Sequence, residues 1–297
     1  MSEVVTTDGV RLRASHWRPS RRRPRGTVCV LQGRSECIEK YFEVVEDLRR
    51  RGFAVATFDW RGQGGSERRL RNRRKGHIDS FVEYDRDFDG FMEQVVLPDC
   101  PPPHFGIGHS TGGLVALRAA KAGRARFDRM VLAAPLVGFA VRPSRQRLFL
   151  AGSAIMTALG LGEVVVPRPN ARWIEEGRFD GNPLTSDPDR FARAVAIYRE
   201  VPEIAVGPAT FGWLYAALQA MSLVNQPDFA TGVDVPALVL LGTLDSVVSL
   251  AAVEQLATEL RAGALSIIPG ARHELMMERD ELREQFWAAF DAFVPGS

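Results

Sequence analysis

The serine at position 110 stands in a run whose residue types suit a nucleophile. Gly108-His109-Ser110-Thr111-Gly112 follows a short apolar segment and precedes a stretch rich in Ala and Leu. A serine on a tight turn between a strand and a helix needs small neighbours, because adjacent backbone comes too close for larger side chains. The N-terminus of the following helix stabilises negative charge that develops near the hydroxyl. The pattern therefore predicts that Ser110 is a catalytic nucleophile, the alternative being a chance match in a glycine-rich loop.

Two further residues fit the roles that such a serine requires, a base and a carboxylate that orients the base. Asp245 follows the apolar strand 237–242 after a short link, and His273 follows a strand that ends at Ile268. Both come at the carboxyl ends of predicted strands, in the chain order Ser, Asp, His. The alternatives are a helix N-cap role for Asp245 and a surface-loop position for His273. We expect Ser110, Asp245 and His273 to form a catalytic triad.

The same chemistry needs backbone N–H groups that stabilise an oxyanion. One donor is the residue after the nucleophile, Thr111, and the second lies in the loop after the first parallel strand. Gln32-Gly33-Arg34 occupies that loop, so we expect the N–H of Arg34 to be the second donor. The sequence predicts no cofactor, and its three cysteines show no metal-ligand spacing.

Apolar runs alternate with amphipathic helical stretches along most of the chain. Strands are predicted at 3–6, 10–17, 27–31, 53–58, 105–107, 130–134, 237–242 and 265–268. This alternation predicts an α/β fold with a mostly parallel central sheet and helices on both faces. The alternation lapses over 136–230, where short helical stretches mix with prolines. We therefore expect a core formed by 1–135 and 231–297, with a helical cap inserted at 136–230.

Composition limits the class of protein. At 297 residues and 45% hydrophobic content, the chain suits one α/β domain with an insertion. A net charge of +2 is too near zero to indicate nucleic-acid binding. The stretch 204–227 lacks charge, but its polar interruptions and helical spacing favour a soluble amphipathic helix that begins near Pro208. An odd number of cysteines and a polar N-terminus predict a cytoplasmic protein. The oligomeric state is left open.

Several motifs together carry a resemblance to a known family. They are Gln32–Glu36 with Tyr41, Asp59–Ser66, Gly108–Gly113, Gly242–Asp245 and Gly270–Glu274. They resemble the serine aminopeptidase S33-like hydrolases, and are most similar to the bacterial lysophospholipase L2 and monoacylglycerol lipase group. The resemblance implies the α/β-hydrolase fold, a helical cap over the site, a triad of Ser110, Asp245 and His273, and hydrolysis of esters with one acyl chain. A general short-chain carboxylesterase and an acyltransferase are the alternatives.

The resemblance also suggests where substrate binds. Gln32 stands where monoacylglycerol lipases commonly carry a His, which leaves the head group open. Glu36 falls where related lipases keep a Glu near the head group, although a helix-start carboxylate is an equal alternative. Independently of the resemblance, the apolar stretches 148–161 and 211–221 predict that the cap supplies an acyl tunnel, which would include Leu218 and Met221.

A dense basic run extends from Arg68 to Lys75, where six of eight residues are Arg or Lys. The acidic residues nearest in sequence are Glu67 and Asp79, so the run is expected to lack local ion pairs. It is interpreted either as a solvated loop or as a contact with an anionic membrane surface.

Overall fold

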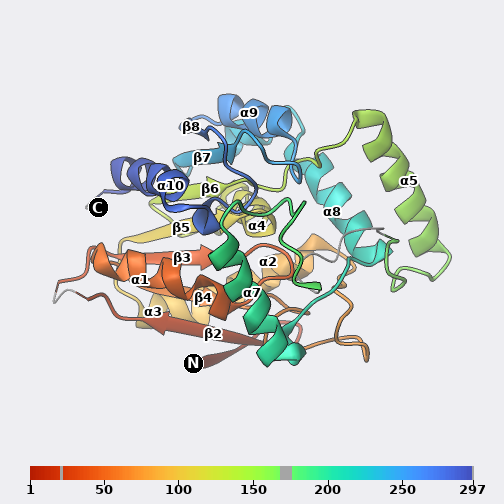
Figure 1. The fold of residues 1–297 in the computed structure, drawn as a ribbon, viewed down its shortest axis with the longest axis horizontal. Helices are drawn as coiled ribbons and strands as arrows, with labels where there is room; N and C mark the ends of the chain where they lie inside the picture. Colours follow the sequence, from red (N-terminus) through yellow and green to blue (C-terminus); the bar gives the residue numbers. More distant parts are fainter. Residues whose placement is uncertain (21–22, 168–175, 296–297) are drawn as a thin grey trace.

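The computed structural model describes residues 1–20, 23–167 and 176–295, and within them eight strands form one sheet (Figure 1). The strand order is β1-β2-β4-β3-β5-β6-β7-β8. β1 and β4 each pair antiparallel with β2, and the other neighbours pair in parallel. The strands are β1 (Ser2–Val5), β2 (Arg11–Trp17), β3 (Thr27–Leu31), β4 (Ala54–Phe58), β5 (His104–His109), β6 (Arg129–Ala133), β7 (Ala237–Gly242) and β8 (Gly263–Ile268). The predicted mostly parallel sheet is confirmed.

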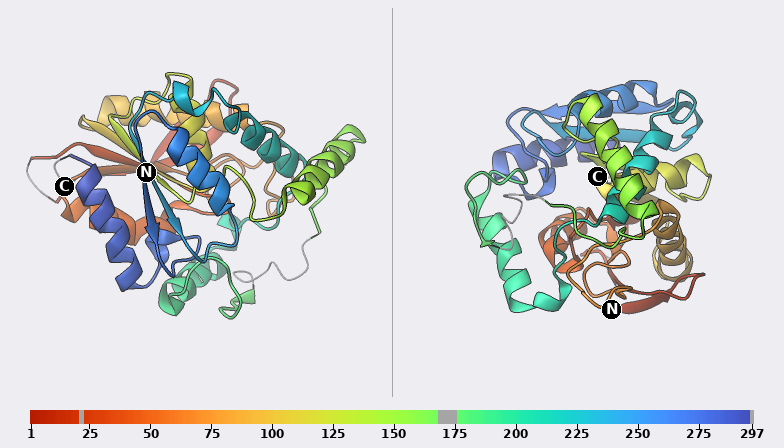
Figure 2. Two further views of the ribbon diagram at one scale, coloured as in Figure 1. Left: turned by 90° about the horizontal axis from the view of Figure 1, so that it is seen from above. Right: turned by 90° about the vertical axis from the view of Figure 1, so that its right-hand side faces the viewer.

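Helices cover both faces of this sheet, which explains why the central strands are apolar throughout (Figure 2). Along β3, Val28 and Val30 face a core cluster built with α1 and α10. Cys29 and Leu31 face the opposite cluster, built with α2, α4, α8 and α9. The α-helices are α1 (Phe42–Arg50), α2 (Phe81–Phe91), α3 (Leu97–Asp99), α4 (Thr111–Lys121), α5 (Pro143–Ala158), α7 (Pro188–Glu200), α8 (Phe211–Val224), α9 (Leu250–Glu259) and α10 (Asp280–Phe293).

Shorter helical turns connect several of these elements. They are η1 (Ile38–Tyr41), η2 (Met92–Val96), η3 (Pro202–Ile204), η4 (Ala230–Gly232) and η5 (Leu275–Met277). The helix expected near Pro208 begins instead at Phe211, because the Thr210 hydroxyl caps it by accepting the N–H of Trp213 at 3.2 Å. None of the helices in the described ranges is both long and apolar enough to cross a membrane.

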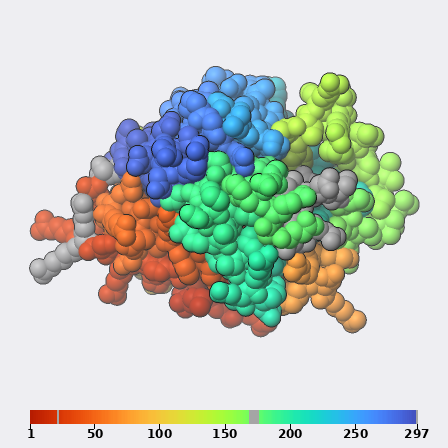
Figure 3. Space-filling model, in the orientation of Figure 1, coloured from red at the N-terminus to blue at the C-terminus, as the bar shows by residue number. Residues whose placement is uncertain are grey.

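Between β6 and β7 the chain leaves the sheet and forms α5, α7 and α8. α5 and α8 lie beyond the carboxyl ends of the parallel strands, while α7 lies on another side, near α1 (Figure 1). The space-filling view, drawn in the orientation of Figure 1, shows the segment around α7, in green, covering the middle of the molecule on the side that faces the viewer (Figure 3). The expected cap limits, 136–230, enclose these helices and also 168–175, which lies outside the described residues. That this insertion acts as a cap stays a prediction.

Candidate active site

Ser110 occupies a strained turn between β5 and α4. Its backbone angles are φ 49° and ψ −112°, a region that side-chain-bearing residues rarely adopt. The flanking glycines are required by space: a Cβ on Gly108 would lie 2.7 Å from Gly113 Cα, and one on Gly112 would lie 2.1 Å from the carbonyl oxygen of Leu31. The turn therefore has the geometry that the motif predicts.

Asp245 and His273 meet across two loops. Nδ1 of His273 and Oδ2 of Asp245 are 2.7 Å apart. The other oxygen, Oδ1, accepts the N–H groups of Val247 at 2.7 Å and Val248 at 3.0 Å. The helix N-cap alternative for Asp245 is wrong, because Ser249 caps the following helix α9; Oδ1 of Asp245 instead holds the turn before that helix. His273 lies in a loop but is only 4% exposed, so the surface-loop alternative is wrong.

The electrostatics of this pair follow from burial and mutual attraction. Burial lowers the pKa of His273, but the Asp245 carboxylate outweighs it and the pKa is raised. Burial raises the pKa of Asp245, yet His273 holds it below its usual value. A carboxylate facing Nδ1 fixes the tautomer with a proton there, so Nε2 is the nitrogen that can accept a proton.

The serine turn and the histidine loop lie side by side. His109 directly precedes Ser110, and its ring centroid is 4.8 Å from that of His273. Ser110, Asp245 and His273 are 7%, 6% and 4% exposed. A nearly buried group of these types can perform nucleophilic acyl transfer, since low exposure strengthens its electrostatic interactions.

The loop after β3 is braced from two sides. The N–H of Gly33 donates to the Glu36 carboxylate, and its carbonyl oxygen accepts Nε2 of Gln63 at 3.2 Å. Gln63 Oε1 in turn accepts the N–H of Ser35 at 2.9 Å. Thr111 is the first residue of α4, so its N–H has no partner four residues earlier within the helix. The sequence indicated the loop but missed Gln63, whose signal was its place in the glycine-rich segment 59–66.

Glu36 lies beneath this loop rather than at the surface, at 4% exposed. Its carboxylate accepts Tyr41 Oη at 2.6 Å and Lys40 Nζ at 2.7 Å, in addition to the N–H of Gly33. These contacts favour a role in holding the loop, and head-group contact by Glu36 stays a prediction.

One group of ligand atoms has the composition of a metal site. Atoms of Glu36, His109 and Glu274 lie within 4.8 Å of one another. The Lys40 ammonium contacts both carboxylates, at 2.7 and 2.6 Å. It therefore already supplies the positive charge that a metal ion would bring.

Leu218 and Met221 are 1% and 0% exposed and belong to the core cluster beneath α8. α8 packs against α4 and α2 there. This burial favours a packing role for both residues. Their predicted contact with an acyl chain stays a prediction.

The basic run does form local contacts, so the expectation that it would lack ion pairs was wrong. Arg69 forms an ion pair with Asp79, because the chain after the basic run turns back and brings Asp79 next to Arg69. Arg68 points inward, where its guanidinium donates to backbone carbonyls that include Gly64 at 2.8 Å and Ile204 at 3.2 Å. Burial lowers the pKa of Arg68 to about 10. Arg71 and Arg73 are exposed.

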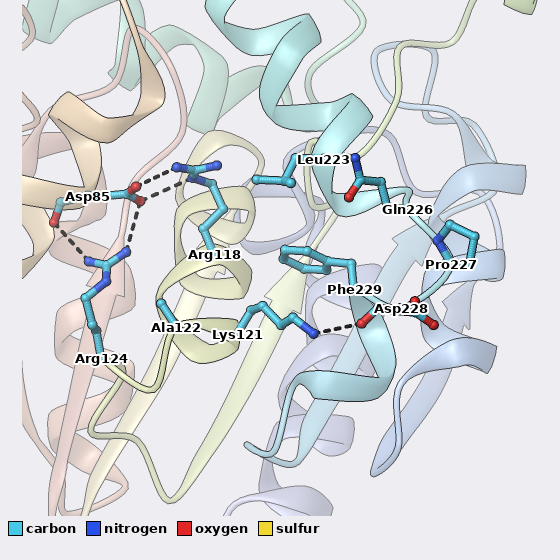
Figure 4. Close-up of a pocket in the computed structure, with 10 residues that line it drawn as sticks. All are labelled: Asp85, Arg118, Lys121, Ala122, Arg124, Leu223, Gln226, Pro227, Asp228 and Phe229. Atoms are coloured by element: carbon cyan, nitrogen blue, oxygen red, sulfur yellow. Dashed lines mark hydrogen bonds and ion pairs between the residues drawn. The ribbon is translucent and has the colours of Figure 1, made fainter.

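A cavity of about 470 Å³ lies at the opposite end of α4 (Figure 4). Arg118 and Lys121 line it, and a helix rise of about 1.5 Å per residue places Lys121 roughly 16 Å from Ser110. Its cations have partners within the protein: Arg118 pairs with the carboxylate of Asp85 at 2.5 Å, and Lys121 donates to the backbone carbonyl of Asp228 at 2.7 Å. This cavity is therefore separate from the candidate active site.

Comparisons with known proteins agree with this arrangement. Residues 22–280 match the family described as serine aminopeptidase, S33. Lysophospholipase L2 of Escherichia coli strain K12 is 31% identical over 278 residues, covering 86% of this chain and 76% of that protein. A probable lysophospholipase L2 of Haemophilus influenzae is 27% identical over 271 residues, covering 91% of this chain and 84% of that protein.

A solved structure shows the same fold. The monoacylglycerol lipase of Paleococcus ferrophilus superposes with a TM-score of 0.74 at 23% identity, covering 96% of this chain and 99% of that one. The family match spans all three loops that carry Ser110, Asp245 and His273. The sheet order, the serine turn and the sequence relationship agree, and the chain is an α/β-hydrolase that belongs to the serine aminopeptidase S33 family.

Proposed function

We propose that this chain hydrolyses carboxylic esters of lipids with a single acyl chain, through an acyl-enzyme on Ser110. The observation that carries the proposal is the 2.7 Å contact between Nδ1 of His273 and Asp245. It joins two loops 28 residues apart and leaves Nε2 of a buried imidazole available beside a strained serine turn. The names of the relatives, lysophospholipase L2 and monoacylglycerol lipase, support a lipid ester as the substrate.

The mechanism follows from these groups. Ser110 Oγ attacks the ester carbonyl carbon while Nε2 of His273 takes its proton, and Asp245 stabilises the resulting imidazolium. The N–H groups of Thr111 and Arg34 hold the carbonyl oxygen as it becomes negative. The intermediate expels the alcohol, which receives the proton from His273. Water then attacks the acyl-serine with His273 again as base, and releases the fatty acid and Ser110.

Loss of the nucleophile is the first test. Ser110→Ala should lower kcat at least about 10⁴-fold, because the members of a triad act as a unit. A fluorophosphonate probe should label the wild type at Ser110, as located by peptide mass spectrometry. Full activity in the variant, or labelling at another serine, contradicts the proposal. An unchanged melting temperature shows that the variant is folded.

The pH profile tests the base. His273 accepts a proton only when neutral, and its pKa is raised above the ordinary 6.5. The value of kcat/KM should therefore fall as the pH drops through that raised pKa. Asp245→Asn removes the main charge that raises it, so the acidic limb should move to lower pH while kcat falls about 10⁴-fold. A limb that does not move in this variant contradicts the assignment of His273.

Substrate series separate this proposal from its alternatives. A lysophospholipid, a monoacylglycerol and nitrophenyl esters of two to sixteen carbons should show the highest kcat/KM with long single chains. A preference for acetate and butyrate esters indicates a general carboxylesterase instead. Transfer of the acyl group to added glycerol, followed by product analysis, identifies an acyltransferase.

We also propose that the enzyme works in the cytoplasm and touches an anionic lipid surface through the exposed part of the basic run. Backbone contacts join this run to an apolar segment around Val165. The N–H of Gly207 donates to the carbonyl oxygen of Arg74 at 2.8 Å, and a few residues further on Thr210 forms a β-bridge with Val165. Beside Val165, Leu161 and Val164 are 43% and 41% exposed. Cations next to exposed apolar side chains suit a lipid surface.

A vesicle assay tests this contact. Arg71→Gln/Arg73→Gln should weaken sedimentation with phosphatidylserine vesicles about 30-fold at low salt, since each cation contributes about 1 kcal/mol near the surface. Arg50→Gln/Arg261→Gln removes the same charge from other surfaces and serves as the control. Hydrolysis of a soluble short ester should be unchanged in both. Equal sedimentation of wild type and both variants contradicts the contact.

A further inference from the structure

Three ionisable side chains meet in a buried cluster beside the proposed base. The Lys40 ammonium lies 2.7 Å from a carboxylate oxygen of Glu36 and 2.6 Å from one of Glu274. The side chains of Lys40, Glu36 and Glu274 are 4%, 5% and 8% exposed. Two carboxylates thus share one cation away from bulk water, and the ionised cluster carries one net negative charge. We call it the Lys40 cluster.

The Lys40 cluster joins two loops of the site. Glu36 belongs to the loop after β3, where it accepts the N–H of Gly33, next to the proposed oxyanion donor Arg34. Glu274 directly follows His273. Lys40, from η1, contacts both carboxylates, so it fastens the loop of the oxyanion donor to the loop of the base.

The cluster also contributes charge at His273. Among the described residues, the carboxylates that act there are those of Asp245 at 2.7 Å, Glu274 and Glu36, and Lys40 pairs with the last two. Burial lowers the pKa of His273, and the charges of Asp245, Glu274 and Glu36 raise it. The ring of His109 lies next to that of His273 at a tilt of 54°, and burial lowers the pKa of His109 to about 4, so His109 is neutral at pH 7.

Glu36 and Glu274 respond differently to their shared cation. Burial raises the pKa of Glu36, but Lys40, His109 and the hydrogen bond from Tyr41 together outweigh burial and lower the pKa to about 2. Burial and the neighbouring Glu36 raise the pKa of Glu274, which Lys40 opposes. Lys40 thus favours the ionised form of both carboxyl groups.

Resting on the proposed function, we propose that Lys40 is a positioning residue that holds the oxyanion loop against the histidine loop, and that the net negative charge of the Lys40 cluster stabilises the imidazolium of His273. Nearby fixed charge acts strongly here because the site excludes water. Fold stability alone does not require such a cluster, since well-packed apolar residues of equal volume are often as stabilising as a buried ion pair.

Two variants separate charge from position. Glu274→Gln preserves shape and leaves the Lys40–Glu36 pair intact, so the cluster becomes neutral. Lys40→Met/Glu274→Gln removes the bridge but restores one net negative charge, on Glu36, which keeps Gly33 and Tyr41 as partners. The matched control is Glu39→Gln, which removes a carboxylate of the same η1 turn that pairs instead with Arg13 at 2.5 Å.

The readouts are kcat and kcat/KM against pH with a soluble short ester, together with the melting temperature of each variant. Glu274→Gln should move the acidic limb of kcat/KM down by at least about 0.5 pH unit. The double variant should return the limb to its wild-type position, while kcat stays about tenfold low because the loops are no longer fastened. Glu39→Gln should match the wild-type profile.

Each part of the proposal has a result that overturns it. An acidic limb in Glu274→Gln that coincides with the wild type removes the charge role. A wild-type kcat in the double variant removes the positioning role. Activity retained in Ser110→Ala means that the proposed function itself has failed. If Ser110→Ala is inactive but Glu274→Gln shows the wild-type pH profile, only the charge role of the Lys40 cluster has failed.

Discussion

α8 and α5 belong to the same insertion and both carry large apolar side chains, yet the surroundings of those side chains differ. α8 buries eight of its 14 residues, and its Trp213 donates to Tyr84 Oη at 3.1 Å. α5 buries one of 16, and its Leu148 and Ile155 are 68% and 60% exposed. Figure 2 shows α5 projecting from the body of the molecule, with α8 between it and the sheet.

This difference shows that large apolar side chains on a helix do not by themselves place that helix against the core. α8 lies on α4, the helix that begins at the serine turn, so its apolar residues complete the core. α5 packs on α8, and only part of its apolar surface, including Phe149 and Leu150, lies against the core. We expect the two helices to respond differently to the same substitution.

A buried charge should produce the largest contrast. Met221→Glu places a carboxylate without a partner in the core and should destabilise the protein by more than about 4 kcal/mol. Ile155→Glu adds the same charge to the exposed face of α5 and should change stability by less than about 0.5 kcal/mol. Urea unfolding of both variants measures the contrast, and equal losses would show that α5 is packed as tightly as α8.

A cavity should produce an intermediate contrast and also test the acyl-chain prediction. Leu218→Ala should cost about 2–5 kcal/mol, and Leu148→Ala should cost far less. Chain-length series on both variants then separate packing from substrate contact. If Leu218 only packs, activity on butyrate and palmitate esters falls in proportion. A selective loss on palmitate shows that it touches the acyl chain.

Glycine substitutions should produce the smallest contrast, with stability changes of opposite sign in the two helices. A Cβ on Gly212 of α8 would lie 2.6 Å from the His77 ring, so Gly212→Ala should destabilise the protein. A Cβ on Gly152 of α5 meets nothing within 4 Å. Gly152→Ala should therefore stabilise it by up to about 1 kcal/mol through helix propensity. Melting temperatures that move in the same direction would contradict this account of α5.

The sequence was sufficient for contacts that the topology determines. Asp245 and His273 each follow a parallel strand, and adjacent parallel strands bring their carboxyl ends to one edge, so their meeting could be predicted. Lys40 and Glu274 are 234 positions apart, and neither lies in a periodic pattern that marks a buried pair. Their contact depends on how η1 packs, which the local sequence does not encode.

α5 and α8 also show that the local sequence does not determine long-range contacts. Periodicity predicts a helix that begins near Pro208, close to the observed start of α8 at Phe211, but the neighbours of a helix depend on the whole fold. The sequence predicts no local ion pair for the basic run, because the nearest acidic residues are Glu67 and Asp79, and only the path of the loop brings Asp79 to Arg69.

The insertion also completes the histidine loop. The N–H groups of His273 and Glu274 donate to the carbonyls of Pro183 at 3.4 Å and Leu184 at 2.8 Å. Thr185 Oγ1 donates to Met277 at 2.6 Å in the same region. A shortened chain with a linker in place of 136–230 would leave those two N–H groups without their acceptors. The insertion is thus not a detachable module, because removing it would also remove backbone contacts that hold the loop of His273.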